Sequence, residues 1–309
     1  MVNFRHFRFW FFVLAATGTA SLLLAGCRSM PFNSSSKKSQ GLSLSQEAIA
    51  AYERKQYDLA EDKFNKSLQL NQDDCETRRY YAENLWQQGK KQESLAALNE
   101  TLACTQRKDN QILIYQSLGE KYLSLGSLNH ASHCAEKLID LNPQSSRGWY
   151  IRAICASRNG DTLEALADFQ RALTYSPDDV ALLQELVHLQ MRMNRYDRAL
   201  ATWQHLARSY STQDEPAEVL YGKAYCMYRL RRLQDADDHL TLAMSRQVDR
   251  PEFYSLLTQV CKEKGEYERA AQTASAAVTR FPQDETCRRS LEEINRQLVA
   301  GRQSGVNLN

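Results

Sequence analysis

The sequence predicts an all-α protein, a solenoid of stacked helix-turn-helix units closed by a final helix. Two observations predict the stack: small residues recur every 34 positions along most of the 309-residue chain, and apolar residues lie between them at helical spacing. A third observation predicts the final helix: the segment 285–299 carries Leu291, Ile294 and Leu298 on one face and charges on the other. Each helical pair has an apolar stripe that it cannot cover alone, so we expect neighbouring units to share one continuous core.

The first 26 residues are typical of an export signal. Arg5 and Arg8 precede the uncharged run FWFFVLAATGTASLLLAG, and small residues end it. An uncleaved transmembrane helix is the alternative, since about 18 uncharged residues just suffice to span a bilayer. Thr17, Gly18 and neighbouring polar residues dilute that run, which favours the cleaved signal. Both interpretations place the rest of the chain outside the cytoplasm.

The run ends in Leu24-Ala25-Gly26-Cys27, which resembles the lipobox of bacterial lipoproteins. The resemblance implies that Cys27 becomes the mature N-terminus, with a diacylglycerol on its sulfur and an acyl chain such as palmitate on its amine. Several acyl chains anchor a protein to a membrane far more firmly than one. Arg28 stands where an Asp would signal inner-membrane retention, which favours the outer membrane. The resemblance therefore places the chain in the cell envelope, lipid-anchored and facing the periplasm.

The segment 27–40 is rich in Ser and Lys and has no apolar period, so it is predicted to be a flexible tether. The full chain has 39 basic and 37 acidic residues, and the signal removes two arginines and no acid, so the mature chain is neutral. Nucleic-acid binding depends on many Lys and Arg contacts to phosphates. A neutral chain is therefore not expected to bind nucleic acid.

The repeat is clearest in GWYIRAICASRNGDTLEALADFQRALTYSPDD, residues 148–179. Trp149, Ala153, Gly160, Ala165 and the Phe, Ala and Pro that follow resemble the tetratricopeptide repeat (TPR), whose small residues let two antiparallel helices approach closely. The resemblance implies a right-handed superhelix. Position 20 of successive units holds Ala60, Ser94, Ala131, Ala165, Ala199, Ala236 and Ala270. The seven units over 41–284 are 41–74, 75–108, 112–145, 146–179, 180–213, 217–250 and 251–284.

Three further segments complete the predicted organisation. Insertions of three residues at 109–111 and 214–216 predict two locally irregular joints in the solenoid. Residues 285–299 are predicted to be a capping helix over the last unit. Residues 300–309 are predicted to be a disordered tail.

Seven cysteines remain after Cys27, an odd number that implies a free thiol or an intermolecular bond outside the cytoplasm. Cys75 and Cys104 fall at the same end of one predicted hairpin and are candidates for a disulfide. Cys134 and Cys155 fall on adjacent helices and are a weaker candidate pair. The alternative is that these cysteines are small buried hydrophobes.

No catalytic motif is present in the mature chain: it lacks G-x-S-x-G, H-E-x-x-H, a P-loop and C-x-x-C. The stretch HASHC places His130 and His133 on one helix face, but a zinc site needs further ligands from another element. We therefore expect no metal, no cofactor and no enzymatic activity.

A binding surface is the predicted functional part. In TPR proteins the first helix of each unit lines a concave face, and Tyr and Arg dominate the binding energy of interfaces. Packing against the next unit is the alternative for the tyrosine stripe, although Leu220, Ala224 and Met227 already supply the packing face there. The Lys, Asn and Arg cluster that clamps a peptide carboxylate in some members is absent. The predicted partner-binding residues are Tyr150, Arg158, His188, Met191, Arg192, Tyr221, Tyr225, Tyr228 and Arg229.

The sequence thus predicts a membrane-anchored scaffold or adaptor that binds protein partners of the cell envelope. It is similar to the TPR lipoproteins that help to build type IV and Tad pili, and to adaptor lipoproteins of the envelope. TPR motifs fix the fold but not the partner. The alternative is a polysaccharide-export or cell-wall-binding protein whose tyrosines stack on sugars. An enzyme is a third class, for which the sequence offers no convergent titratable groups.

Overall fold

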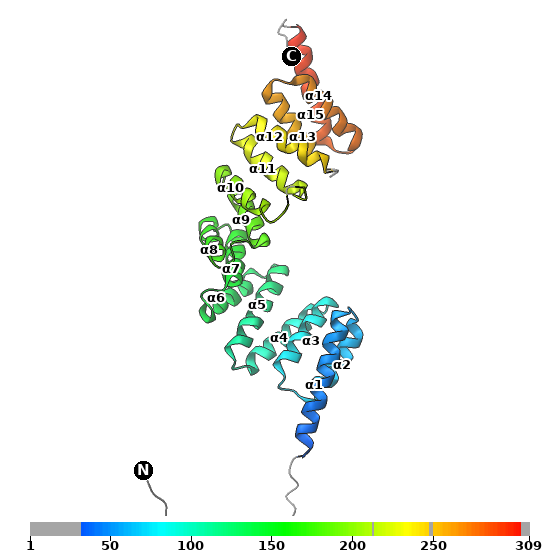
Figure 1. Cartoon of the computed structure of the whole chain (residues 1–309), viewed down its shortest axis with the longest axis vertical. Coiled ribbons are helices and arrows are strands. Elements are labelled where there is room, and N and C mark those ends of the chain that lie inside the picture. The colour runs from blue at the N-terminus through cyan, green and yellow to red at the C-terminus, as the bar shows by residue number, and fades with distance from the viewer. Residues whose placement is uncertain (1–31, 212, 247–249, 304–309) are drawn as a thin grey trace, which may run out of the picture.

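The computed structural model describes residues 32–211, 213–246 and 250–303, and within these ranges the chain forms fifteen α-helices and no strand. The helices stack into an elongated body with α1 at one end and α15 at the other (Figure 1). The first helices of seven successive pairs are α1 (Phe32–Glu53), α3 (Cys75–Gln87), α5 (Lys108–Ser124), α7 (Ser146–Asn159), α9 (Val180–Arg192), α11 (Ala217–Arg229) and α13 (Pro251–Lys264). The second helices are α2 (Tyr57–Leu70), α4 (Lys91–Cys104), α6 (Leu128–Leu141), α8 (Thr162–Tyr175), α10 (Tyr196–Ala207), α12 (Leu233–Ser245) and α14 (Tyr267–Arg280), and α15 (Glu285–Gln303) follows them.

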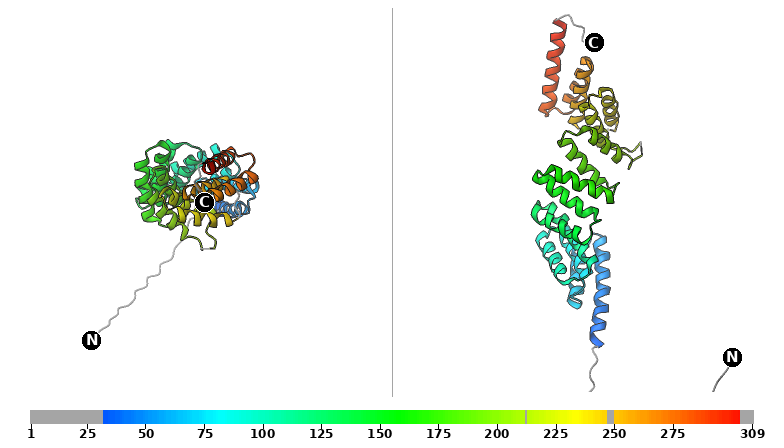
Figure 2. Two further views of the ribbon diagram at one scale, coloured as in Figure 1. Left: turned by 90° about the horizontal axis from the view of Figure 1, so that it is seen from above. Right: turned by 90° about the vertical axis from the view of Figure 1, so that its left-hand side faces the viewer.

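The predicted fold class is confirmed: the described residues form an α-solenoid of seven helical pairs with a single helix after the last pair. Seen end-on, the helices wind around the long axis, as a superhelix does (Figure 2). The small residues at position 20 are fully buried where helices cross, as Ala60, Ala165 and Ala270 illustrate, each with 0% exposure. A larger side chain at such a crossing would force the helices apart.

The turn inside each pair repeats at the same period as the core. Position 15 of all seven units has a positive φ, between 56° and 94°. Glycine occupies it in four units, at positions 89, 126, 160 and 265, and adopts this conformation without strain. Lys55, Asn194 and Arg231 occupy it in the other three. The backbone therefore keeps the 34-residue register even where the sequence motif departs from it.

Four joints are capped by the residue at the last position of a unit. Asp74, Ser145, Asp179 and Asp284 each accept a hydrogen bond from the backbone N–H three residues later, at 2.9–3.1 Å. Both joints with insertions lack such a cap, and so does the joint at Arg250, where Pro251 begins the next helix. The first insertion adds a turn to the start of α5, which begins at Lys108, and the second forms the loop before α11. The structure thus differs from the regular repeat at both predicted joints.

Both ends of the solenoid are more helical than predicted. The prediction of a flexible tether is wrong for residues 32–40, which belong to α1. Ser67 donates a hydrogen bond to the carbonyl of the buried Gly41 at 2.8 Å, and extending a docked helix by further residues costs little. The prediction of a disordered tail is likewise wrong for residues 300–303, because α15 continues to Gln303.

The predicted signal and its lipidation site Cys27 lie outside the described residues, as does the end of the tail from residue 304. Across the described ranges, no helix combines the length and the apolar character that crossing a membrane requires.

Candidate functional site

Three adjoining pockets lie along the first helices of units four to seven, and together they form what we call the central groove. The first pocket encloses about 530 Å³ between α7, α9 and α11, and Arg158, Glu185 and Arg192 line it. The second encloses about 560 Å³ between α9, α11 and α13, with Trp203 in its wall. The third encloses about 340 Å³ between α11, α13 and the start of α15.

Neighbouring pockets of the groove share lining residues. His188 and Met191 line both the first and the second pocket. Tyr221 lines the second and the third, and Tyr225 lines the first and the third. The three pockets therefore adjoin one another from α7 to the start of α15.

The structure brings six of the nine predicted partner-binding residues together around this groove. Arg158, His188 and Arg192 are exposed, and Met191, Tyr221 and Tyr225 are half-buried. Leu220, Ala224 and Met227 form the packing face of α11, with exposures of 1%, 0% and 4%. The remaining three predicted residues, Tyr150, Tyr228 and Arg229, do not line the pockets.

The tyrosines of α11 serve both packing and the groove. Tyr221 stacks face to face on Phe253 of α13, with ring centroids 4.6 Å apart and planes at 7°. Tyr225 meets Tyr196 edge-on at 6.1 Å, and the Arg229 guanidinium lies 4.3 Å from the centroid of the Tyr196 ring. Arg229 also donates a hydrogen bond to the Tyr225 hydroxyl at 3.0 Å. These contacts fix the aromatic wall before any partner binds.

Tyr150 and Tyr228 make contacts within the solenoid. Tyr150 lies edge-on to Phe169 at 6.2 Å, and the Arg147 guanidinium lies 4.6 Å from its ring centroid. Tyr228 donates a hydrogen bond to the Glu263 carboxylate of the next unit at 2.6 Å. Burial, and then this bond, raise the pKa of Tyr228 to about 12. Its phenol therefore stays protonated as a donor that joins two units.

Sequence reasoning missed several residues of the second pocket, above all Trp203 and Phe253. Trp203 belongs to the second helix of its unit, whereas the predicted concave positions all lie on first helices. The signal that could have revealed it is Gly222 in the middle of α11, because a Cβ there would lie 2.3 Å from the Trp203 ring. The glycine lets the indole pack directly against the α11 backbone.

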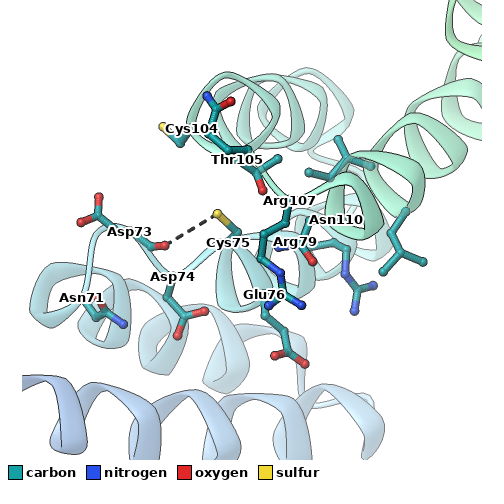
Figure 3. Close-up of a pocket in the computed structure, with 13 residues that line it drawn as sticks. Asn71, Asp73, Asp74, Cys75, Glu76, Arg79, Cys104, Thr105, Arg107 and Asn110 are labelled. Carbon is teal, nitrogen blue, oxygen red and sulfur yellow. Dashed lines mark hydrogen bonds between the residues drawn. The ribbon is translucent and has the colours of Figure 1, made fainter. Parts of the chain in front are cut away.

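A separate pocket of about 690 Å³ lies at the irregular joint between units two and three, and both Cys75 and Cys104 line it (Figure 3). All seven described cysteines are free, so the predicted Cys75–Cys104 disulfide is not formed. The Cys75 thiol donates instead to the carbonyl of Asp73 at 3.7 Å (Figure 3), and Cys104 is exposed at the end of α4.

The other candidate pair, Cys134 and Cys155, consists of buried free thiols. Burial, reinforced by the neighbouring Cys155, raises the pKa of Cys134 to about 12, and burial raises that of Cys155 to about 11. His130 stacks on Tyr122 at 5.0 Å, while His133 is exposed. In the part of the chain that the structure describes, no group of three or more His, Cys, Asp or Glu side chains could hold a metal ion.

Comparisons with known proteins agree with this geometry. Two family models described as tetratricopeptide repeat match the chain, one over residues 117–180 and 185–243 and the other over 156–211. The fold is accordingly that of a TPR α-solenoid. No curated protein sequence matches the chain.

Among solved structures, a TPR protein from Parabacteroides merdae superposes with a TM-score of 0.56 at 17% identity, covering 82% of this chain and 98% of that one. PilW, described as a widely conserved type IV pilus biogenesis factor, has a TM-score of 0.56 at 18% identity and covers 70% and 98%. YrrB, described as a TPR protein with an unusual peptide-binding site, has a TM-score of 0.56 at 14% identity and covers 63% and 98%. At these identities the similarity concerns the fold alone.

Proposed function

We propose that this chain is a protein-interaction scaffold of the bacterial cell envelope, anchored through lipid on Cys27, and that the central groove holds an extended segment of a partner protein. The observation that supports it best is the series of three adjoining pockets along four units, with aromatic and arginine side chains along it. The proposal assigns no catalytic step to the chain.

Two features support a place for this scaffold in the assembly of a cell-envelope complex. The sequence begins with a run that resembles a lipoprotein signal, and the fold resembles that of PilW, a type IV pilus biogenesis factor. We therefore favour a role in the assembly of a pilus, a secretion system or another envelope complex. The peptide-binding site named for YrrB supports a peptide-like ligand for the same fold.

Cross-linking in intact cells tests the scaffold role. The parent chain is compared with a variant that carries Tyr225→Ala and Arg229→Ala, which together dismantle the aromatic wall of the groove. A matched control carries Leu163→Ala and Glu164→Ala, two exposed residues on α8 outside the groove. We expect defined envelope proteins to be captured by the parent and the control and lost from the groove variant. Equal capture by all three would assign partner binding to another surface, and absence of any enriched protein would favour a glycan ligand.

The anchor is tested separately with Cys27→Ser. Lipidation requires the cysteine thiol, so we expect the parent to incorporate labelled palmitate and to sediment with membranes. The variant is expected to do neither. Membrane sedimentation of Cys27→Ser at the parent's level would favour the uncleaved transmembrane helix.

A further inference from the structure

The charged residues of the central groove are segregated along its length. At the α7–α9 end, the first pocket contains two arginines and one glutamate, Arg158, Arg192 and Glu185. Arg158 donates to the backbone carbonyl of Leu123 at 3.1 Å and Arg192 to the hydroxyl of Ser157, and in the described ranges neither forms an ion pair. With two arginines against one glutamate, this end of the groove carries a net positive charge.

The opposite end presents negative charge. Glu252 and Asp284 line the third pocket, and the described residues that line it include no Lys or Arg. Asp284 accepts the backbone N–H of Cys287 at 2.9 Å, and this hydrogen bond lowers the pKa of its carboxyl. Asp284 is thus held ionised at the start of α15. Glu252 has no ion-pair partner in the described part of the chain.

Between the two ends, the second pocket is mainly apolar. Met191, Tyr210, Val219 and Phe253 line it together with Trp203, which is 6% exposed. Arg250 and Glu218 at its rim pair with each other at 3.2 Å, and Glu252, which the second pocket shares with the third, leaves the rim toward the third pocket negative. The Trp203 Nε1–H is buried and has no acceptor among the described residues. This nitrogen lies on the side of the indole that packs against Gly222, and an unpaired buried donor costs free energy that a carbonyl oxygen recovers only if the partner reaches that side.

We propose that the central groove selects an extended peptide with a fixed order of chemistry: an acidic side chain at the Arg158 and Arg192 end, a large apolar side chain in the pocket beside Trp203, and a basic side chain near Glu252 and Asp284. This inference rests on the proposed function, since it names the chemistry of the partner that the same groove would hold. Charge complementarity of this kind gives selectivity and orientation more than raw affinity.

Helix spacing sets the distance between the three groups. Neighbouring packed helices lie about 8–10 Å apart, and α9 and α11 flank a pocket and are not closely packed, so two steps along the first helices span roughly 20 Å or slightly more. An extended chain advances about 3.3 Å per residue, so the acidic and basic residues are separated by about six positions with the apolar residue between them. The expected pattern is acid, two residues, large apolar, two residues, base, in either chain direction.

Selection from a displayed library of random peptides of about twelve residues tests this pattern, since that length exceeds the span of the groove. The purified full chain is the target, and the Tyr225→Ala, Arg229→Ala variant is used for counter-selection. We expect the enriched peptides to share the acid–apolar–base order. Enriched peptides that need the groove but lack this order would overturn the inference while leaving the proposed function intact. If no enriched peptide depends on the groove, the proposed use of the groove fails as well.

Charge reversal then tests each end with a selected peptide. Arg158→Glu combined with Arg192→Glu should weaken binding roughly tenfold, and replacing the acid of the peptide by Lys should restore it. Glu252→Lys at the other end of the groove should likewise weaken binding, and replacing the basic residue of the peptide by Glu should restore it. The two variants change exposed side chains, so their thermal unfolding should match the parent. Loss of binding without rescue by the reversed peptide would contradict the assigned ends.

Trp203→Phe tests the middle pocket. It removes the Nε1–H donor while keeping an aromatic ring, so affinity should fall by a factor of roughly five if a peptide carbonyl accepts that hydrogen bond. Binding by selected peptides in which the apolar residue is replaced by Ser should fall in both proteins. Unchanged affinity for Trp203→Phe, with unchanged unfolding temperature, would contradict a role for this donor.

Discussion

Asp237 joins the last two units through a buried ion cluster. Its carboxylate is 5% exposed and accepts hydrogen bonds from Arg269 at 2.5 Å and Lys264 at 2.6 Å, both on the following unit. Burial alone would raise the pKa of Asp237, but the bonds from these two cations outweigh it and hold the pKa below its usual value. Removal of one partner from a buried cluster leaves the others uncompensated.

We therefore expect Asp237→Ala to lower the free energy of unfolding by about 3 kcal/mol, measured by urea denaturation. The neighbouring Asp238 is exposed and bonds only to Gln234 within its own helix, at 2.9 Å. Asp238→Ala should change stability by less than about 0.5 kcal/mol. Similar losses for both variants would show that the cluster contributes little.

The lowered pKa of Asp237 also predicts a pH dependence. A carboxyl whose pKa is lowered by folding stabilises the folded state above its unfolded pKa, about 3.8, and loses that contribution as the pH falls through its folded value. The stability difference between the parent and Asp237→Asn should therefore be constant from pH 7 to about 5 and shrink below about pH 4. Denaturation at several pH values measures it, and a difference that grows on acidification would have the wrong sign.

At the scale of the helical pair, the turn carries the clearest test of the repeat geometry. Lys55 has a φ of 61°, which a side chain with a Cβ adopts only at a cost of about 1 kcal/mol. Lys55 is exposed and has no ion-pair partner in the described ranges. A substitution there should therefore change stability through the backbone conformation alone.

Lys55→Gly is expected to raise the free energy of unfolding by about 0.5–1 kcal/mol, since glycine relieves this strain. Lys55→Ala is the matched control and should give no such gain, because alanine retains a Cβ. The measurement is again urea denaturation. Equal effects of the two substitutions would attribute the change to the lysine side chain.

The sequence predicted the helices well where packing requires the same type of residue at the same position of each unit. The buried Ala at position 20 and the amphipathic pattern of 285–299 fixed the period, the pairs and the final helix. The sequence did not predict the positive φ of Lys55 and Arg231, because this conformation is imposed by neighbouring residues and Lys and Arg are not typical turn residues. It also failed at residues 32–40, whose polar composition does not reveal that a docked helix continues through them.

The candidate site was predicted in the same uneven way. Residues on the first helices, such as Arg158, His188 and Tyr225, follow from the register of the repeat. Trp203 does not, because it reaches the groove from a second helix and only through the space left by Gly222. Such a contact depends on how two units pack, and a single repeat motif contains no information about it.

At the scale of the whole molecule, each unit is stabilised mainly by its neighbours. α15 covers the last unit with Cys287 and Ile294, each 2% exposed. In a solenoid, stability is approximately a sum of unit and nearest-neighbour terms.

Removal of residues 285–309 should therefore destabilise the C-terminal end locally. We expect amide hydrogens of α13 and α14 to exchange much faster, while those of α7 and α8, three units away, keep their protection. Hydrogen-exchange mass spectrometry of the two chains provides the comparison. A uniform loss of protection along the chain would show that the solenoid unfolds as one cooperative unit.

The central claim is that the groove of units four to seven is the surface that meets a partner. Site-specific photo-cross-linking in intact cells tests it most directly, with a photoreactive amino acid placed at His188 in the groove or at Leu163, which is 69% exposed on α8 outside it. We predict that defined envelope proteins are captured from position 188 and not from position 163. Capture from position 163 alone would contradict the claim and place the partner on the opposite surface of the solenoid.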